Sequence, residues 1–537
     1  MAERSTPALA AGIETFVYPG ETEPVLAGVE LSLAAGTLTG VLGGSGSGKS
    51  TLGRLLAGWL LPGAGGALGG FLDLGGTRLL FTGKAADPRI NPGSWGRVVG
   101  FVPQDSAAAL STVRETVAEE LAFGLENAGV ERAVMADAVR RTASLIGLAH
   151  LLDKAPETLS GGQLRRLAIG CAVISGPAVL VMDEPFASLD RAGAESLADL
   201  VRDLVKGGTA VVVLSQRVDG LLLDADTWLL LTGGTIAVTG TPAEVTAAGV
   251  LKAAGVISPR PAPGSSSVPP VPCCPDPSDP VLAAQVPVDA VPSPPALELR
   301  NVSFTYGRSK RHRFFRTGAA AAAPVLHGLS LSVGKGEIVA VTGANGAGKS
   351  TLLRHLNGLL QPTAGSVLVN GRTIGGQPAG RVSGEVGLLF QQPRDQLFER
   401  TVEREVRFGL DRHRRRPAAH GGGTGRHDGA EATAVHSALA AVGLENHSGR
   451  HPAELPASHQ RLLALATVLA GRPSVLALDE PTVALDGHGL ATLNSVVRSA
   501  AAEGTAVVVV THDLEYARSI AHRLVHLDSG RLLPLAV

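Results

Sequence analysis

Apolar runs, glycine-rich turns and helix-like stretches follow one another along this chain in the same order twice. Leu38–Leu42 and Ile338–Thr342 are short apolar runs, a pattern typical of buried strands. Each leads through a glycine-rich turn into a helix-like stretch, at 51–61 and 351–360. Strands that alternate with helices in this way predict an α/β fold.

The recurring order reflects an internal repeat. The segment 40–51 recurs at 340–351, and Val179-Leu-Val-Met-Asp-Glu-Pro185 recurs as Val475-Leu-Ala-Leu-Asp-Glu-Pro481. The two pairs are offset by 300 and 296 residues, so both halves share one layout. This similarity predicts two copies of one domain.

A proline-rich segment separates the two copies. Residues 259–295 hold 13 of the 34 prolines, a composition that favours extended polyproline II and predicts a tether. The predicted domains are therefore 1–258 and 296–537. The second domain carries two insertions, 308–316 and 411–429, which we interpret as solvated loops, with a basic patch for lipid headgroups or nucleic acid as the alternative.

The composition argues against a protein that coats nucleic acid and against one that spans a membrane. The 537 residues are 45% hydrophobic and carry a net charge of −1, which suits buried cores and lacks the basic excess of a protein that coats nucleic acid. The apolar stretch 221–231 is interrupted by Asp224 and Asp226, and a membrane span needs about 20 mostly apolar residues. We therefore expect a soluble protein that reaches a membrane only through partners.

The glycine-rich turns carry the candidate chemistry, since both read Gly-x4-Gly-Lys-Ser. Glycines let successive backbone N–H groups curl around phosphate oxygens, and the following helix presents its positive end. Lys49 and Lys349 are expected to reach the β- and γ-phosphates, while Ser50 and Ser350 can ligate Mg²⁺. The predicted phosphate-binding residues are Gly43, Gly44, Ser45, Gly46, Ser47, Gly48, Lys49, Ser50 and Thr51, with Gly343, Ala344, Asn345, Gly346, Ala347, Gly348, Lys349, Ser350 and Thr351.

The second apolar run of each half ends in an Asp-Glu pair. Asp183 and Asp479 follow a predicted buried strand, which places a carboxylate beside the metal. Glu184 and Glu480 then stand where they can polarise an attacking water. The sequence thus predicts an ATP site that uses Mg²⁺ in each half.

A third motif indicates the family. Leu159-Ser-Gly-Gly-Gln163 lies 23 residues before Asp183, just ahead of a helix-like run. With the P-loops and Asp-Glu pairs, it resembles the ABC ATPase family, whose signature loop is LSGGQ. The resemblance covers both halves apart from the linker and the insertions. It implies two tandem P-loop NTPase domains, each with a RecA-like core sheet, an antiparallel β subdomain and a helical signature subdomain.

In this family the two domains pack head to tail, and each ATP lies between one P-loop and the other domain's signature. Such intramolecular pairing would bring Ser160, Gly161, Gly162 and Gln163 to the γ-phosphate bound by half two.

The same resemblance gives roles to further residues. Tyr18 and Tyr306 match the aromatic that stacks on adenine, with a core aromatic as the alternative. Gln104 and Gln391 match the Q-loop glutamine, which senses Mg²⁺ and the water. His512 matches the switch histidine that contacts the γ-phosphate. The D-loops are Ser188-Leu-Asp190 and Ala484-Leu-Asp486, and the implied metal ligands are Ser50, Gln104, Asp183, Ser350, Gln391 and Asp479.

Each half departs from the family pattern at one motif. The signature position of half two reads Leu455-Pro-Ala-Ser-His459, in which Pro456 removes a backbone donor and the glycines have gained side chains. Half one has Gln216 where half two has His512, and glutamine can donate a hydrogen bond but cannot become cationic.

Head-to-tail pairing would place both differences from the family pattern, the altered signature of half two and Gln216 of half one, at the same composite site. Site one combines the P-loop of half one with the signature of half two, and site two combines the P-loop of half two with LSGGQ. We expect site two to hydrolyse ATP and site one to bind ATP and turn over slowly; neutral drift with two active sites is the alternative. The catalytic and metal-binding residues of site two would be Lys349, Ser350, Gln391, Asp479, Glu480 and His512, and those of site one Lys49, Ser50, Gln104, Asp183, Glu184 and Gln216.

The stretch after each Q-loop indicates a subgroup within the ABC ATPase family. Half two reads Phe390-Gln-Gln-Pro-Arg-Asp-Gln-Leu-Phe398 and then Thr401-Val-Glu-Arg-Glu-Val-Arg-Phe-Gly-Leu410, and half one reads Thr116-Val-Ala-Glu-Glu-Leu-Ala-Phe-Gly-Leu-Glu-Asn127. These segments are similar to the ATPases of energy-coupling-factor (ECF) importers, the cobalt, nickel and vitamin uptake group, although half one departs at Pro103-Gln-Asp-Ser106.

That similarity implies ATP hydrolysis that drives import of a vitamin, a vitamin precursor or a transition-metal ion. The implied partners are a transmembrane coupling subunit and a small membrane substrate-binding subunit, with the chain at the cytoplasmic face of the cell membrane and no nucleic acid bound. The alternatives are a fused ATPase of a sugar or peptide importer, and a soluble tandem ABC ATPase that acts on ribosomes or in regulation.

Overall fold

The computed structural model describes residues 7–60, 65–84, 86–187, 189–258, 294–306, 324–414 and 427–535, with side chains omitted at 411–414, 427–430 and Leu535. Nearly all of the predicted tether, the insertion 308–316, most of the insertion 411–429 and Ser188 of the first D-loop lie outside these residues.

Half one contains one antiparallel sheet and one larger mixed sheet. The four-stranded sheet has the order β2-β1-β4-β5, and the six-stranded sheet has the order β10-β9-β3-β8-β7-β6. Within the larger sheet β9, β3, β8, β7 and β6 are parallel, and β10 pairs antiparallel with β9. The strands are β1 (Leu9–Val17), β2 (Leu26–Leu33), β3 (Leu38–Leu42), β4 (Ala67–Leu74), β5 (Thr77–Thr82), β6 (Val99–Val102), β7 (Val179–Asp183), β8 (Ala210–Ser215), β9 (Thr227–Thr232) and β10 (Thr235–Gly240).

Half two repeats this topology strand for strand. Its four-stranded sheet has the order β12-β11-β14-β15, and its six-stranded sheet has the order β16-β17-β18-β13-β19-β20. The strands are β11 (Leu297–Phe304), β12 (Leu326–Val333), β13 (Ile338–Thr342), β14 (Ala364–Val369), β15 (Arg372–Thr373), β16 (Val386–Leu389), β17 (Val475–Asp479), β18 (Ala506–Val510), β19 (Arg523–Asp528) and β20 (Arg531–Leu535).

Helices cover the parallel sheets and form a separate helical group in each half. The helices of half one are α1 (Lys49–Leu56), α2 (Pro92–Val98), α3 (Val117–Asn127), α4 (Arg132–Leu145), α5 (Gly161–Val173), α6 (Arg191–Lys206), α7 (Gly220–Leu223) and α8 (Pro242–Ala247). Those of half two are α9 (Lys349–Leu356), α10 (Ala379–Val382), α11 (Val402–Arg414), α12 (His427–Ala441), α13 (Ala457–Ala470), α14 (Gly487–Ala502) and α15 (Leu514–Ile520).

The apolar runs read from the sequence become the central strands. Every residue of β3, β7, β13 and β17 is buried, as expected for parallel strands that are covered on both faces. The helices after the P-loops end earlier than predicted, at Leu56 and Leu356, rather than near 61 and 360. The reason is that Gly58 and Gly358 adopt left-handed conformations, with φ of 68° and 75°, which cannot continue a helix.

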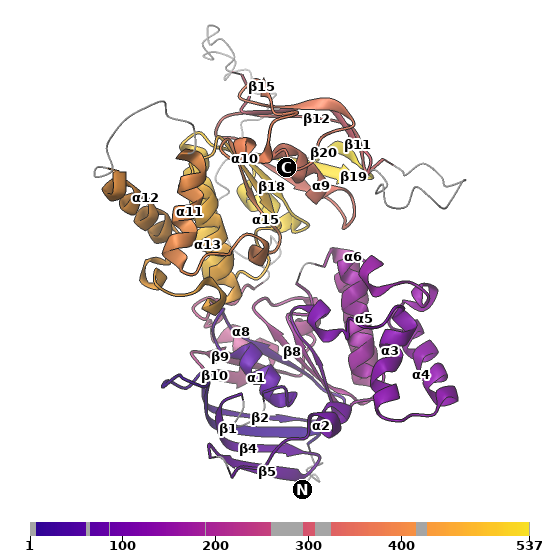
Figure 1. The fold of residues 1–537 in the computed structure, drawn as a ribbon. Coiled ribbons are helices and arrows are strands. Elements are labelled where there is room, and N and C mark those ends of the chain that lie inside the picture. Colours follow the sequence, from indigo (N-terminus) through magenta and orange to yellow (C-terminus); the bar gives the residue numbers. More distant parts are fainter. Residues whose placement is uncertain are drawn as a thin grey trace.

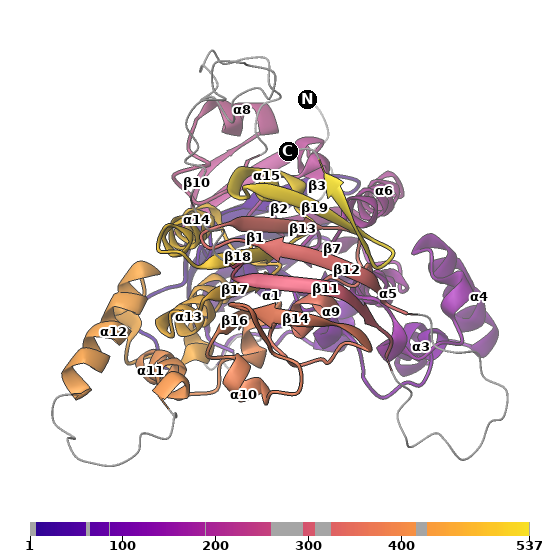
Figure 2. The same ribbon diagram turned by 90° about the horizontal axis from the view of Figure 1, so that it is seen from above.

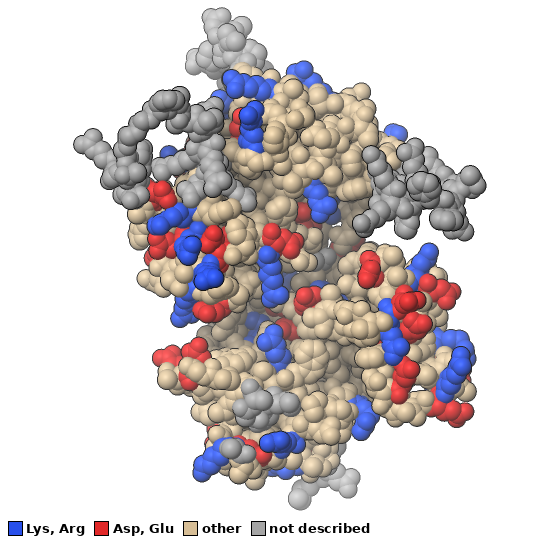
Figure 3. Space-filling model, viewed as in Figure 1, with Lys and Arg blue, Asp and Glu red and all other residues tan. Residues whose placement is uncertain are grey.

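The two halves stack on each other, with half one below and half two above in Figure 1. The helical groups α3–α5 and α11–α13 lie on opposite sides of the molecule in both ribbon views (Figures 1 and 2). On the face shown in Figure 3, acidic and basic side chains are interspersed over both halves. Within the described residues, no helix is long and apolar enough to cross a membrane.

Candidate functional site

The two P-loops adopt the same backbone conformation at the carboxyl ends of β3 and β13. Gly48 and Gly348 precede the helices with φ of 100° and 101°, a region that side chains rarely adopt. A Cβ atom at Gly48 would also lie 2.7 Å from the Leu26 side chain. Glycine is therefore required at this position on two counts, and the loop can keep its backbone close to a phosphate.

The P-loop lysines are buried and held by their own loops. Lys49 Nζ donates to the carbonyl oxygens of Gly43 and Gly44 at 2.7 and 2.8 Å. Lys349 Nζ makes the matching bonds to Gly343 and Ala344 at 2.8 and 3.1 Å. Burial lowers the pKa of both lysines, against the nearby carboxylates, which raise it. Each lysine is thus the first residue of its helix, and its ammonium group is held inside the P-loop.

The predicted metal ligands converge beside these lysines. The Ser50 hydroxyl lies beside Asp183, and the Ser350 hydroxyl lies beside Asp479. Burial raises the pKa of both aspartates, and the Oδ1 atom of each is buried without a hydrogen-bond partner among the described residues. Two orphaned carboxylate oxygens, each next to a serine hydroxyl, fit the oxygen ligands that Mg²⁺ requires. When bound, the ion would neutralise phosphate charge at this position.

The Q-loop glutamines lie at the same edge of the sheet as these aspartates. β6 and β16 pair in parallel with β7 and β17, so that Val102 is opposite Met182 and Leu389 is opposite Leu478. Gln104 and Gln391 come two residues beyond the ends of β6 and β16. The backbone therefore places each glutamine at the same sheet edge as the predicted metal-binding aspartate of its own half.

The glutamate that follows each aspartate has a strained backbone. Glu184 and Glu480 have φ of 49° and 46°, and each backbone N–H donates to the neighbouring strand, at Leu214 O and Val510 O, over 2.9 Å. Positive φ in a glutamate costs free energy and occurs mostly at functional positions. The turn directs both carboxylates toward the residues at 216 and 512.

The partners of these two glutamates differ between the halves. The Glu480 carboxylate accepts from the His512 backbone at 3.1 Å and lies 2.9 Å from His512 Nδ1. In half one the Gln216 backbone donates to Glu184 at 2.9 Å, but the Gln216 side-chain Oε1 is buried without a hydrogen-bond partner in the described part of the chain. Burial raises the pKa of Glu184 to about 7.

Each P-loop touches an aspartate from the other half. Ser45 N donates to Asp486 Oδ2 at 2.8 Å, and Asn345 N donates to Asp190 Oδ2 at 3.3 Å. A Cβ atom at Gly46 would lie 3.9 Å from Pro456 Cγ. The signature of half two, which differs from LSGGQ, therefore faces the P-loop of half one. The structure thus arranges the halves head to tail, with both P-loops at their interface.

Comparisons with known proteins identify the family of this chain. The ABC transporter family matches residues 26–187 and 326–483. An ABC transporter ATP-binding protein from Streptomyces avermitilis is 35% identical over 97% of this chain and 92% of its own length. The chain belongs to the ABC transporter family. A Methanosarcina acetivorans protein of the same description is 28% identical over 97% of this chain and 88% of its own length.

Among solved structures, cbiO1 from Clostridium perfringens, part of the ABC transporter complex cbiONQ, is similar at 25% identity with a TM-score of 0.37. The match covers 45% of this chain and 87% of that one.

The two ABC signatures begin their helices differently. Ser160 caps α5 in a reciprocal capping box, in which its hydroxyl accepts from Gln163 N at 3.4 Å and Gln163 Oε1 accepts from Ser160 N at 2.9 Å. Pro456 begins α13 without a side-chain cap, and Ser458 Oγ is buried without a hydrogen-bond partner in the described structure. Gly161 and Gly162 lie in the first turn of α5. A preorganised helix start is therefore present only in half one.

The tyrosines predicted to stack on adenine lie beside the P-loop helices. The Tyr18 and Tyr306 hydroxyls bond to Thr51 Oγ1 and Thr351 Oγ1 at 3.0 and 3.1 Å. Tyr306 is 45% exposed. These contacts place both rings next to the phosphate-binding helices.

Sequence reasoning missed two arginines of the ABC signature helices. Arg165 donates to Pro185 O at 2.7 Å and to Ala187 O, so it holds the turn after Glu184. Arg461 donates to Glu480 O at 3.1 Å and to Gln391 O, and burial lowers its pKa to about 10. Each arginine follows its signature leucine by six residues, so alignment of the two repeats would have found the pair.

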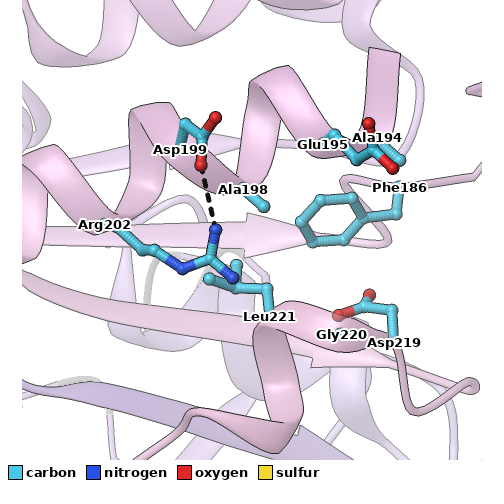
Figure 4. Close-up of a pocket in the computed structure, with 9 residues that line it drawn as sticks. All are labelled: Phe186, Ala194, Glu195, Ala198, Asp199, Arg202, Asp219, Gly220 and Leu221. Carbon is cyan, nitrogen blue, oxygen red and sulfur yellow. Dashed lines mark hydrogen bonds and ion pairs between the residues drawn. The ribbon is translucent and has the colours of Figure 1, made fainter. Parts of the chain in front are cut away.

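A cavity of about 380 Å³ lies behind the switch position of half one rather than at a P-loop (Figure 4). In Figure 4 the Phe186 ring and the Asp219 carboxylate face it, and Arg202 bonds to Asp199. Asp219 caps α7 through Leu222 N at 3.0 Å, and burial raises its pKa to about 6. The charged groups of the cavity already have partners, because Arg202 pairs with Asp199 and Asp219 caps α7. We therefore assign the cavity no ligand.

Proposed function

We propose that this chain is the ATP-hydrolysing energy-coupling subunit of an ECF-type importer, with one consensus and one degenerate ATP site. Its cargo would be a vitamin, a vitamin precursor or a transition-metal ion. The observation that carries ATP hydrolysis is the cluster of Lys349, Asp479, Glu480 and His512 at one P-loop, with Glu480 Oε1 3.9 Å from Lys349 Nζ.

In the proposed reaction, Glu480 accepts a hydrogen bond from a water and orients it toward the γ-phosphorus, and it takes up the proton of the water as the new oxygen–phosphorus bond of inorganic phosphate forms. The bond between the γ-phosphorus and the bridging oxygen breaks, and ADP leaves. The N–H groups of the P-loop and the LSGGQ helix start stabilise the equatorial oxygens, and His512 holds Glu480 in place.

The coupling role is supported by a matched pair of loops beyond the Q-loops. Glu405 is fully buried and accepts from Phe398 N and Glu399 N at 2.8 and 2.7 Å. In half one, Glu120 is 4% exposed and accepts from Ser111 N at 2.6 Å. These are the second glutamates of Thr401-Val-Glu-Arg-Glu405 and Thr116-Val-Ala-Glu-Glu120. The motif that resembles ECF ATPases therefore anchors the loop in front of its own helix.

Each anchored loop presents an apolar side chain to solvent. Phe398 and Val113 each lie seven residues before the anchoring glutamate and are 58% and 71% exposed. Exposed apolar side chains at equivalent places in both halves favour a partner that contacts both halves. We assign this surface to the transmembrane coupling subunit, which would hold the chain at the cytoplasmic face of the cell membrane.

Copurification tests the assignment. The chain is co-expressed with the membrane proteins encoded beside its gene, and the bound subunits are identified by mass. We expect a coupling subunit and a small substrate-binding subunit, lost in a Phe398→Asp, Val113→Asp variant that keeps its ATPase activity. Leu80→Asp, at a 64% exposed residue of β5, is the control and should retain them. Recovery of ribosomes, or of sugar or peptide importer subunits, would refute the ECF assignment.

A further inference from the structure

The loop that carries Gln216 in half one and the loop that carries His512 in half two, which we call the switch loops, contact each other directly across the interface. Arg217 follows Gln216 in half one, and Asp513 follows His512 in half two. Arg217 Nη1 donates to Asp513 Oδ2 at 3.0 Å, although the residues are 296 positions apart. Equivalent positions of the two halves thus meet each other, which is the contact expected on a two-fold axis.

The charge reversal at this position makes the contact attractive. Two identical halves with aspartate at both positions would oppose two carboxylates here, whereas half one supplies a guanidinium group. Half one thus differs from half two at two consecutive positions. Gln216 stands where half two has His512, and Arg217, which stands where half two has Asp513, contacts half two.

The Asp513 end of the pair holds the catalytic switch of site two. Asp513 Oδ1 accepts from Tyr516 N at 2.9 Å and caps α15, so its two oxygens serve two partners. The adjacent His512 lies 2.9 Å from Glu480 Oε2. A fixed Asp513 consequently fixes the backbone from which His512 reaches Glu480.

The Arg217 end is fixed by a segment of half one that has entered site one. We call residues 253–257 the strap. Ile257 N donates to Gln216 O at 2.9 Å, and Val218 N donates to Ile257 O at 2.8 Å, so the strap clamps the backbone on both sides of Arg217.

The other end of the strap touches the P-loop of half one and the start of α14, just after the D-loop of half two. Gly255 O accepts from Gly487 N of half two at 2.8 Å, and Ala253 O lies 3.3 Å from His488 Nε2. A Cβ atom at Gly44 of the P-loop would lie 2.8 Å from Ala254 O. Movement of the site-one P-loop therefore displaces the strap and, through it, the backbone of Arg217.

We propose that Arg217 is a positioning residue for site two, through which the degenerate site sets the placement of His512 against Glu480. The inference rests on the proposed function, since it assigns hydrolysis to site two. Arg217 and Asp513 side chains are 44% and 14% exposed, so the pair is partly screened by solvent and its effect is modest.

The test measures ATPase kinetics in a Glu184→Gln background, where turnover comes from site two. Arg217→Gln should lower kcat about threefold at unchanged KM, and Arg217→Lys should restore most of it. Salt should lower kcat of the parent toward that of Arg217→Gln and leave the variant unaffected. The control is Arg202→Gln, since Arg202 is 39% exposed and pairs with Asp224 at 2.8 Å inside half one; it should leave kcat unchanged.

A double-mutant cycle with Asp513→Asn, which keeps a capping side chain, should show non-additive losses. Additive losses, or equal kcat for Arg217→Gln and Arg202→Gln, would overturn the inference and leave the proposed function intact. ATPase activity that does not depend on Glu480 would overturn the proposed function and this inference with it.

Discussion

Site one and site two share one backbone and differ in a few side chains. Both have the left-handed glycine before the helix, the Ser–Asp pair and a glutamate at positive φ. Only half two pairs its glutamate with an imidazole, and only the signature helix of half one begins with a complete capping box. Glycines and buried strands thus set the shape of an ATP site, while its chemistry depends on the side chains at and just after the strand ends.

The sites also differ in how closely the halves engage. At site one the D-loop aspartate is 2.8 Å from the P-loop amide, and the strap adds two contacts. At site two the corresponding distance is 3.3 Å, and a Cβ atom at Gly346 would meet nothing within 4 Å. The two halves therefore make closer contact at site one than at site two.

The largest expected difference concerns the switch residues. His512→Ala should lower kcat about 10²-fold, because Glu480 loses its imidazole partner. Gln216→Ala should change kcat less than about twofold, since the Gln216 side chain supports no hydrolysis in this account. Steady-state ATPase assays of both purified variants give the comparison, and a larger effect at Gln216 would reverse the assignment of the sites.

A smaller effect is expected from the strap. Gly255→Val adds a Cβ atom 3.0 Å from His488 and 3.4 Å from Gly44, and it should speed release of a fluorescent ATP analogue from site one about tenfold. Gly249→Val is the matched control, because Gly249 has a similar φ of 67° but open space around it. Both are measured in a Lys349→Ala background. Equal release rates would show that backbone strain, and not the strap contact, is responsible.

The smallest effect concerns stability and pH. The folded pKa of Glu184, about 7, lies above its usual 4.5, so the folded state binds the proton more tightly and is destabilised as pH rises from about 4.5 to 7. Glu184→Gln should therefore stabilise half one by about 1–2 kcal/mol at pH 8 and by almost nothing at pH 4.5. Denaturant unfolding at both pH values checks this, and a gain independent of pH would contradict it.

The sequence was sufficient for the local motifs and insufficient for contacts across the interface. β3 and β13 coincide with the predicted apolar runs, and the Asp-Glu pairs end β7 and β17, because buried parallel strands leave a strong local pattern. Arg217 and Asp513 left no such signal, since an ion pair between residues 296 positions apart depends on how the halves pack. The strap was missed for the same reason.

Site two is expected to carry out most of the ATP hydrolysis, and site one to bind ATP and turn over slowly. This expectation is tested most directly by the ATPase rates of Glu480→Gln and Glu184→Gln, measured on the full chain with its membrane partners. We expect a loss of about 10²–10³-fold for Glu480→Gln and less than about twofold for Glu184→Gln. Equal losses in the two variants would contradict it.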